Sequence, residues 1–233
     1  MRGVFITGTD TGVGKTHCGV ALARALVAQG LRIRARKPVE SGCPLVDGEL
    51  QPQDALAYAA ASGEPLDAVC RWRLAAALSP ERAARLEGVD YRLADLAAHC
   101  RAGVAADDFL LVEGAGGFLS PIAPDGLNAD LALALRLPVL LVGADRLGAI
   151  HQVLATSEAI ERRGLALAGV VLNRVAPQSD PLLDNAADLR RWLGREVLRL
   201  DHAADATPGP LPTDHAWAAL IGQLAGPGRP ANA

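Results

Sequence analysis

A glycine-rich loop near the N-terminus constrains the fold of this chain more than any other feature. The segment Gly12-Val13-Gly14-Lys15-Thr16 follows the short apolar run 4–7 and precedes an amphipathic stretch over 16–29. Backbone N–H groups of such a loop can turn inward around phosphate oxygens, and the helix N-terminus adds a partial positive charge. The lysine of this pattern reaches the β- and γ-phosphates, and the threonine hydroxyl ligates Mg²⁺. The loop therefore predicts a site for a nucleoside triphosphate with magnesium.

The spacing of this loop differs from the usual phosphate-loop pattern. Five residues rather than four separate Gly8 from Gly14. A turn that merely joins a strand to a helix is the alternative, and the Gly-Lys-Thr sequence in its strand–helix context disfavours it. Loops of partition and cell-division ATPases carry a second lysine near the loop start, where this chain has Asp10. A switch ATPase of that kind is therefore a weaker alternative.

Apolar runs alternate with amphipathic segments along the whole chain. This rhythm predicts an α/β fold, a single P-loop domain whose mostly parallel sheet has helices on both faces. The expected strands are 4–7, 33–37, 109–112, 138–142, 168–172 and 197–200, and the expected helices are 16–29, 54–62, 80–86, 93–102, 147–163, 181–193 and 215–224. We expect the domain to span residues 1–225 and the Pro- and Ala-rich segment 226–233 to be a flexible tail. Ligands of such sheets bind at the carboxyl ends of the strands.

Lysine is rare in this chain. Of its 23 basic residues only Lys15 and Lys37 are lysines. Because arginine serves at every other basic position, these two sites are expected to need a compact point charge. Lys37 ends the strand 33–37, where it could stabilise charge on a transferred phosphoryl group. A solvated lysine at a strand end is the alternative.

Other polar residues follow predicted strands or begin predicted helices. Glu113 follows the strand 109–112, where P-loop proteins place a metal-binding carboxylate, and the glycines after it leave room for a substrate. Asp54 begins a helix, so on its own it is best interpreted as an N-cap, with Mg²⁺ ligation as the second interpretation. Asn173 could contact an adenine edge or form a turn with equal odds. Ser41, beside Gly42, could hydrogen-bond an anionic substrate.

Composition argues against several classes of protein. The formal charge of −3 and the absence of a basic stretch argue against nucleic-acid binding. No apolar run reaches the ~18 residues typical of a membrane helix, and the N-terminus lacks the pattern of a secretory signal. The four cysteines are far apart in sequence, which fits reduced thiols better than disulfides or a zinc site. We therefore expect a cytoplasmic protein with no nucleic-acid or membrane partner.

Several sequence blocks, in this order and spacing, resemble the dethiobiotin synthetase family over residues 1 to about 175. The blocks are Gly8-Thr9-Asp10-Thr11-Gly12-Val13-Gly14-Lys15-Thr16, Lys37-Pro38-Val39-Glu40-Ser41-Gly42, Asp54-Ala55-Leu56, Val112-Glu113-Gly114-Ala115-Gly116-Gly117 and Leu147-Gly148-Ala149-Ile150. The resemblance implies an ATP-dependent cyclo-ligase. An amine of 7,8-diaminopelargonate takes up CO₂ (or bicarbonate) as a carbamate, which attacks the γ-phosphate of ATP. The second amine then closes the ring of dethiobiotin and releases phosphate.

The resemblance also implies roles for individual residues and a homodimer. Lys37 and Lys15 would be catalytic, and Mg²⁺ would be held by Thr16, Asp54 and Glu113. The ATP-binding residues would be Gly12, Val13, Gly14, Lys15, Thr16, His17, Asp54, Glu113, Gly114, Ala115, Gly116 and Asn173. The substrate-binding residues would be Thr11, Lys37, Ser41, Gly116, Gly117 and His151.

This chain departs from the family pattern in three places. His151-Gln152 stands where the family usually has Asn-His, at a helix start that binds the substrate carboxylate. The segment 197–200 lacks the usual proline of the loop that packs on the base, and Glu81 replaces a histidine after Ser79-Pro80. A further alternative is an amide-forming ligase of the cobyrinate diamide synthase type. Those enzymes need an added glutaminase domain, for which 233 residues leave no room.

Overall fold

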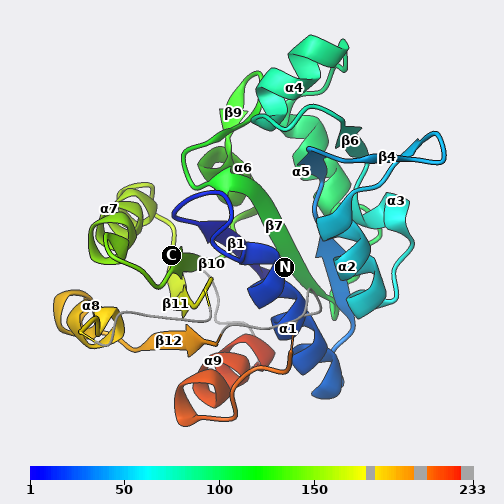
Figure 1. The fold of residues 1–233 in the computed structure, drawn as a ribbon. Helices are drawn as coiled ribbons and strands as arrows, with labels where there is room; N and C mark the ends of the chain where they lie inside the picture. The colour runs from blue at the N-terminus through cyan, green and yellow to red at the C-terminus, as the bar shows by residue number, and fades with distance from the viewer. Residues whose placement is uncertain (177–181, 202–208, 227–233) are drawn as a thin grey trace.

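A six-stranded parallel sheet forms the centre of the computed structural model, which describes residues 1–176, 182–201 and 209–226 (Figure 1). The strand order is β12-β11-β10-β1-β7-β2, and every neighbouring pair is parallel. The strands are β1 (Arg2–Gly8), β2 (Ile33–Arg36), β7 (Phe109–Gly117), β10 (Val139–Ala144), β11 (Leu167–Asn173) and β12 (Val197–Leu200). The predicted single α/β domain with a mostly parallel sheet is confirmed.

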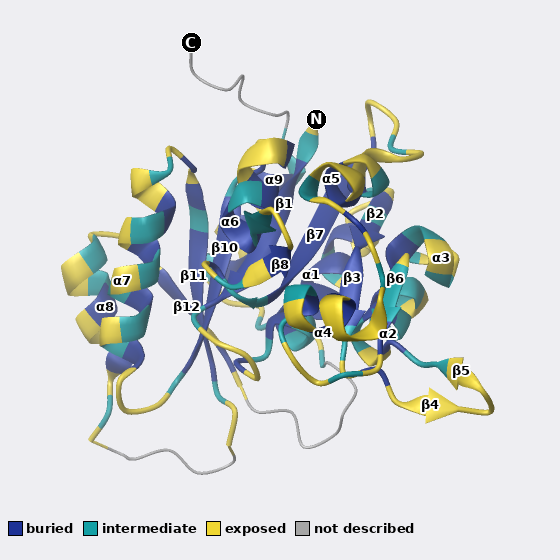
Figure 2. Ribbon diagram, turned by 90° about the horizontal axis from the view of Figure 1, so that it is seen from above, coloured by how far each residue is buried: buried dark blue, intermediate teal, exposed yellow. Residues whose placement is uncertain are grey.

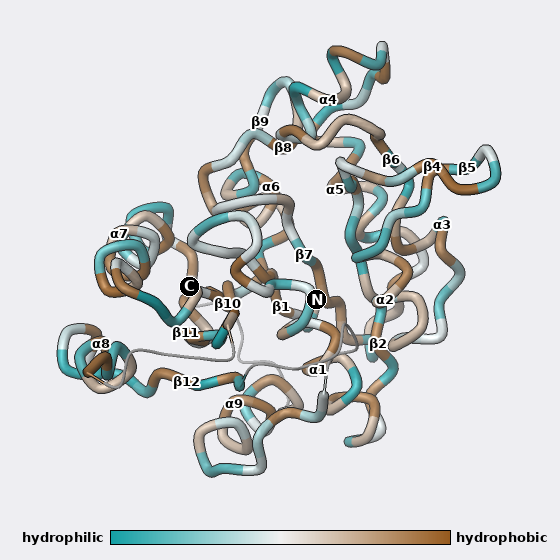
Figure 3. Tube along the Cα trace, in the orientation of Figure 1, coloured by the Kyte–Doolittle hydropathy of each residue, from teal (hydrophilic) through white to brown (hydrophobic). Residues whose placement is uncertain are grey.

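Helices cover both faces of this sheet. One face packs on α1 (Lys15–Ala28), α2 (Gln53–Ser62), α3 (Leu66–Val69) and α9 (His215–Ala225). The other packs on α4 (Pro80–Glu87), α5 (Leu93–Arg101), α6 (Asn128–Leu135), α7 (Ala149–Arg162) and α8 (Asn185–Leu193). Successive strand residues point to opposite faces, so Val4 and Ile6 join the first core while Phe5 joins the second. Buried, apolar strands therefore run between the helical layers (Figures 2 and 3).

Short strands extend the loops outside the central sheet. Strand β3 (Val39–Ser41) pairs in parallel with β6 (Trp72–Leu74). Two small hairpins consist of β4 (Leu45–Val46) with β5 (Glu49–Leu50), and of β8 (Pro121–Ala123) with β9 (Gly126–Leu127). These pairs and helix α6 were not expected from the sequence. The Asp130 carboxylate accepts a hydrogen bond from the Leu127 N–H at the start of α6, a local feature that could have indicated this helix (2.8 Å).

Three element boundaries differ from the expected ones in ways that affect the site. Strand β7 was expected to stop before Glu113, but it continues to Gly117, because Gly117 pairs with Gly8 beyond a register shift in β1. Glu113 therefore lies inside a strand rather than after it. Helix α2 begins at Gln53 after Pro52, so the interpretation of Asp54 as its N-cap is wrong. Helix α7 begins at Ala149 rather than at Leu147.

Two expectations fall partly outside the described residues. The helix expected over 181–193 begins at Asn185, and Pro181 lies outside the described part of the chain. Of the expected tail 226–233, only Gly226 is described. Within the described residues, no helix combines the length and apolar character needed to cross a membrane.

Candidate active site

The phosphate loop joins β1 to α1 and depends on two glycines in the left-handed region. Gly12 has φ 74° and Gly14 has φ 90°, a backbone conformation that disfavours other residues. Gly14 directly precedes the first residue of α1, so the helix N-terminus faces the loop. The Lys15 ammonium turns back over the loop and donates to the carbonyl oxygen of Asp10 (3.0 Å). Burial lowers the pKa of Lys15, although nearby carboxylates oppose this effect.

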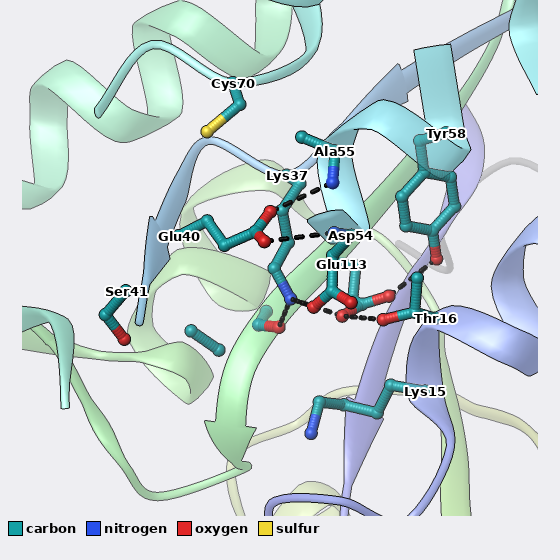
Figure 4. Close-up of polar contacts among 12 residues, drawn as sticks. Lys15, Thr16, Lys37, Glu40, Ser41, Asp54, Ala55, Tyr58, Cys70 and Glu113 are labelled. Carbon is teal, nitrogen blue, oxygen red and sulfur yellow. Dashed lines mark hydrogen bonds and ion pairs between the residues drawn. The ribbon is translucent and has the colours of Figure 1, made fainter. Parts of the chain in front are cut away.

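Lys37 lies just after β2 in a buried, densely paired position (Figure 4). Its ammonium donates to Asp54 Oδ2 (2.9 Å), to the Gly114 carbonyl oxygen (3.3 Å) and to Glu113 Oε1. Burial alone would lower its pKa, but the carboxylates of Glu113, Asp54 and Glu40 raise it well above its ordinary value. Lys37 is therefore a fixed ammonium at neutral pH.

Two carboxylates and a hydroxyl converge beside Lys37. Glu113 is fully buried, and its Oε1 accepts a hydrogen bond from Thr16 Oγ1 (3.1 Å). The Asp54 side chain is 39% exposed, which leaves it accessible to a ligand. Burial would raise the pKa of Asp54, but Lys37 and Thr16 hold it below its usual value, so the carboxylate remains ionised. Figure 4 shows Thr16, Asp54 and Glu113 pointing toward the same space.

Glu40 is a further member of this cluster, and no role for it was predicted from the sequence. Its two carboxylate oxygens accept hydrogen bonds from the backbone N–H groups of Asp54 (3.0 Å) and Ala55 (2.9 Å). These are free donors at the N-terminus of α2, where Pro52 has no side chain that could cap them. Burial raises the pKa of Glu40 to about 7, with Lys37 opposing this rise. A proline at an N-cap position indicates that an acceptor must come from elsewhere in the chain.

Tyr58 was also missed. Its buried hydroxyl donates to Glu113 Oε2 (2.8 Å), and its pKa is raised well above the ordinary value, mainly by burial. Tyr58 stands four residues after Asp54, and residues at that spacing lie on one face of a helix. This spacing in the sequence could have indicated that the side chains of Asp54 and Tyr58 reach the same site.

The glycine segment at the end of β7 is held by Asn128. The Asn128 side chain accepts from the Ala115 N–H (2.9 Å) and donates to the carbonyl oxygens of Ala115 (2.7 Å) and Gly117 (3.0 Å). The Gly117 N–H donates to Ser120 Oγ (3.0 Å). The backbone N–H groups of Ala115 and Gly117 therefore already have acceptors within the chain.

The remaining predicted site residues lie in different places. Thr11 is exposed on the phosphate loop next to Gly116, and His17 lies in the first turn of α1. The Ser41 hydroxyl donates to the Leu78 carbonyl oxygen (2.6 Å), so it is engaged by the protein itself. His151 is exposed in the first turn of α7.

Asn173 ends β11 beneath the phosphate loop. Its side-chain amide donates to the carbonyl oxygen of Val13 (3.1 Å) and packs directly against Gly14. This contact supports the loop backbone, and it uses one of the donors that the sequence analysis assigned to an adenine edge.

A glycine loop, a helix N-terminus and an acidic strand residue, arranged at the edge of a parallel sheet, define a P-loop nucleotide-binding protein. The family model that matches the chain is described as an AAA domain and covers residues 2–200. The chloroplast FtsY structure from Physcomitrella patens aligns with 97% of this chain and 66% of its own length, at TM-score 0.49 and 17% identity.

Two curated relatives identify the family more narrowly. The ATP-dependent dethiobiotin synthetase BioD of Anaeromyxobacter dehalogenans strain 2CP-1 is 48% identical over 201 residues, which are 86% of this chain and 89% of the relative. The protein of the same name from Rhodopirellula baltica is 42% identical over 204 residues, which are 82% of this chain and 80% of the relative. This chain belongs to the family of ATP-dependent dethiobiotin synthetases. Membership of this family favours the ring-closing ligase over the two alternatives considered from the sequence, a switch ATPase and an amide-forming ligase of the cobyrinate diamide synthase type.

Proposed function

We propose that this chain carboxylates 7,8-diaminopelargonate with CO₂ and closes the ring of dethiobiotin at the expense of ATP and with Mg²⁺. The family supports this reaction. One observation carries the proposal. Lys37 contacts both Asp54 and Glu113, and Glu113 in turn contacts Thr16 of the phosphate loop. These residues supply the charges that transfer of a phosphoryl group requires.

The phosphate loop binds the triphosphate of ATP in this proposal. The amides of residues 12–17 and the Lys15 ammonium contact the phosphate oxygens, and the N-terminus of α1 adds its partial positive charge. The glycine segment 114–116 lies beside the nucleotide. Asn173 acts mainly by supporting the loop through its bond to Val13.

The donor set formed by Thr16, Asp54 and Glu113 fits Mg²⁺. In residues 1–176, 182–201 and 209–226, no three or more His, Cys, Asp or Glu side chains form a group that could hold a metal by themselves. Mg²⁺ does not need such a group, because it usually takes one or two carboxylates together with phosphate oxygens and waters. Held by Thr16, Asp54 and Glu113, the ion would supply positive charge that offsets the charge developing during phosphoryl transfer.

Lys37 stabilises the transferred phosphoryl group. A carbamate oxygen attacks the γ-phosphorus and ADP leaves; the free amine then attacks the carbamate carbon and phosphate leaves. The carboxylates around Lys37 hold its ammonium in place. This preorganised charge stabilises the negative charge that develops on the phosphoryl oxygens. Thr11, Ser41, Gly116, Gly117 and His151 are the residues we assign to the diamine and its carbamate. The Ser41 hydroxyl and the Gly117 amide would exchange their bonds to Leu78 and Ser120 for bonds to the substrate.

Three broader assignments complete the proposal. The ligase unit comprises residues 1–225, with 226–233 as its tail. The protein acts in the cytoplasm, where the four buried free thiols stay reduced. It works as a homodimer, as the family resemblance implies.

Dependence of phosphate release on both substrates tests the proposed function. Purified protein with Mg·ATP should release phosphate only when 7,8-diaminopelargonate and bicarbonate are both present, and one dethiobiotin should form per phosphate. Phosphate release that is indifferent to the diamine would overturn the ligase assignment.

A further inference from the structure

The two oxygens of the Glu113 carboxylate have different partners. Oε1 accepts from Thr16 Oγ1 (3.1 Å) and from Lys37, on the side of the phosphate loop. Oε2 accepts from the hydroxyl of Tyr58 (2.8 Å), which comes from α2. Glu113 has no exposed surface, so the Tyr58 hydroxyl rather than bulk water occupies Oε2.

The Tyr58 hydroxyl is held in place from several sides. A Cβ at Gly19 of α1 would overlap the hydroxyl, so the absence of a side chain there makes the space that it occupies. Glu40 binds the N-terminus of α2 and thereby fixes the helix that carries Tyr58. Oε2 of Glu113 is therefore paired with a donor that has little freedom to move.

The number of carboxylate oxygens available affects which divalent ion a site prefers. Ca²⁺ accepts six to eight ligands at longer distances and readily takes both oxygens of one carboxylate. Mg²⁺ requires near-octahedral geometry and is usually held by single carboxylate oxygens. A donor that occupies one oxygen of an acidic ligand therefore favours the smaller ion.

We infer that Tyr58 is a positioning residue that reserves Oε2 of Glu113, so that this glutamate presents one oxygen to the metal and the site prefers Mg²⁺ over Ca²⁺. This inference rests on the proposed metal site. Tyr58 touches neither metal nor substrate and acts only through Glu113. Outer hydrogen-bond partners of metal ligands commonly change metal affinity by about 10- to 100-fold when they are removed.

Tyr58→Phe removes the hydroxyl and keeps the ring. The matched control is Tyr91→Phe, because Tyr91 is the only other tyrosine of the chain and its buried hydroxyl donates to the carbonyl oxygen of Ile122 (3.0 Å). Calorimetry with a non-hydrolysable ATP analogue, in Mg²⁺ and separately in Ca²⁺, gives two dissociation constants for each protein. We expect the preference for Mg²⁺ to shrink about tenfold in Tyr58→Phe and to stay unchanged in Tyr91→Phe.

The outcomes separate this inference from the proposed function. If Tyr58→Phe weakened binding of the ATP analogue equally in Mg²⁺ and in Ca²⁺, Tyr58 would have a merely structural role. That result would overturn the inference, while the proposed metal site would stand. Analogue binding to the unaltered protein that is indifferent to either ion would overturn the metal site and the inference with it. Gly19→Ala provides a second test, since the added methyl group would overlap both the hydroxyl and the ring of Tyr58, as well as Ile6, and should shift the preference in the same direction.

Discussion

The two lysines of this chain occupy regions of opposite character. In the phosphate loop, Lys15 donates to a backbone carbonyl oxygen, and no ion pair joins it to a carboxylate in the part of the chain that the structure describes. In the region between β2 and α2, Lys37 contacts Asp54 and Glu113. Among the described residues Lys15 has no carboxylate paired with it, although Asp10 lies on the same loop, whereas the second region holds more anions than cations.

This difference shows what kind of ligand the site is prepared to accept. The charges of Lys37, Asp54 and Glu113 sum to −1, and ionised Glu40 would make the sum −2. A polyphosphate supplies the anionic partner that Lys15 lacks, and a divalent cation supplies the positive charge that the second region lacks. Mg·ATP satisfies both regions at once, and either component alone leaves one of them uncompensated.

The largest expected effect comes from exchanging the lysines for arginine, because the two regions should respond differently. Lys37→Arg should lower turnover by roughly 100- to 1000-fold, since a planar guanidinium cannot replace a compact charge in this buried position. Nucleotide affinity should be nearly unchanged. Steady-state phosphate release and calorimetry with ADP measure the two quantities.

Lys15→Arg is the matched comparison. It should weaken nucleotide binding, because the ammonium that contacts the phosphates is altered. If Lys37→Arg turned over at the normal rate, or lost nucleotide affinity as Lys15→Arg does, the proposed division of roles would be wrong.

The sequence predicts the convergence of Lys37 and Glu113 but not the contacts that arrange them. Both follow or lie within parallel strands, and such strands bring their carboxyl ends to one edge of the sheet. Glu40 and Tyr58 could not be assigned from pattern alone. Their partners are backbone amides and a carboxylate far along the chain, so their roles depend on how β3, α2 and β7 pack.

Hydrogen bonds between residues distant in sequence explain where sequence interpretation and structure differ. Asp54 looked like a helix cap because it begins an amphipathic run, yet Glu40 satisfies the amides at the helix start and leaves the Asp54 carboxylate for Lys37. The Ser41 hydroxyl, which we assign to the substrate, donates to the carbonyl oxygen of Leu78, a bond that was not predicted from the sequence. Such competition among nearby acceptors is set by tertiary structure.

A smaller effect is expected from Asp54→Asn, which removes one negative charge from the second region. Mg²⁺ should enhance nucleotide affinity about tenfold less than in the unaltered protein, since Asn keeps an oxygen but loses the charge that Mg²⁺ prefers. Without metal the variant should bind nucleotide at least as well, because repulsion between Asp54 and the phosphates is gone. Calorimetry with ADP, in Mg²⁺ and in EDTA, measures both effects.

The control is Asp67→Asn, which removes an exposed carboxylate from the neighbouring helix α3. It should leave the enhancement by Mg²⁺ unchanged. An Asp54→Asn protein with full enhancement would exclude Asp54 from the metal site.

The smallest expected effect concerns pH and the Glu40 carboxylate of the second region, which binds the N-terminus of α2. Its pKa of about 7 in the folded protein lies above the ordinary 4.5, so folding favours the protonated form and stability falls as the pH rises through about 7. Between about pH 6 and pH 8 the loss amounts to about 1 kcal/mol, or a few degrees in Tm. Glu40→Gln is neutral throughout and lacks this dependence, so the Tm of the unaltered protein should fall relative to that of the variant as the pH increases. A gap in Tm that stayed constant, or moved in favour of the unaltered protein at high pH, would mean that hydrogen bonds from Asp54 and Ala55 outweigh burial at Glu40.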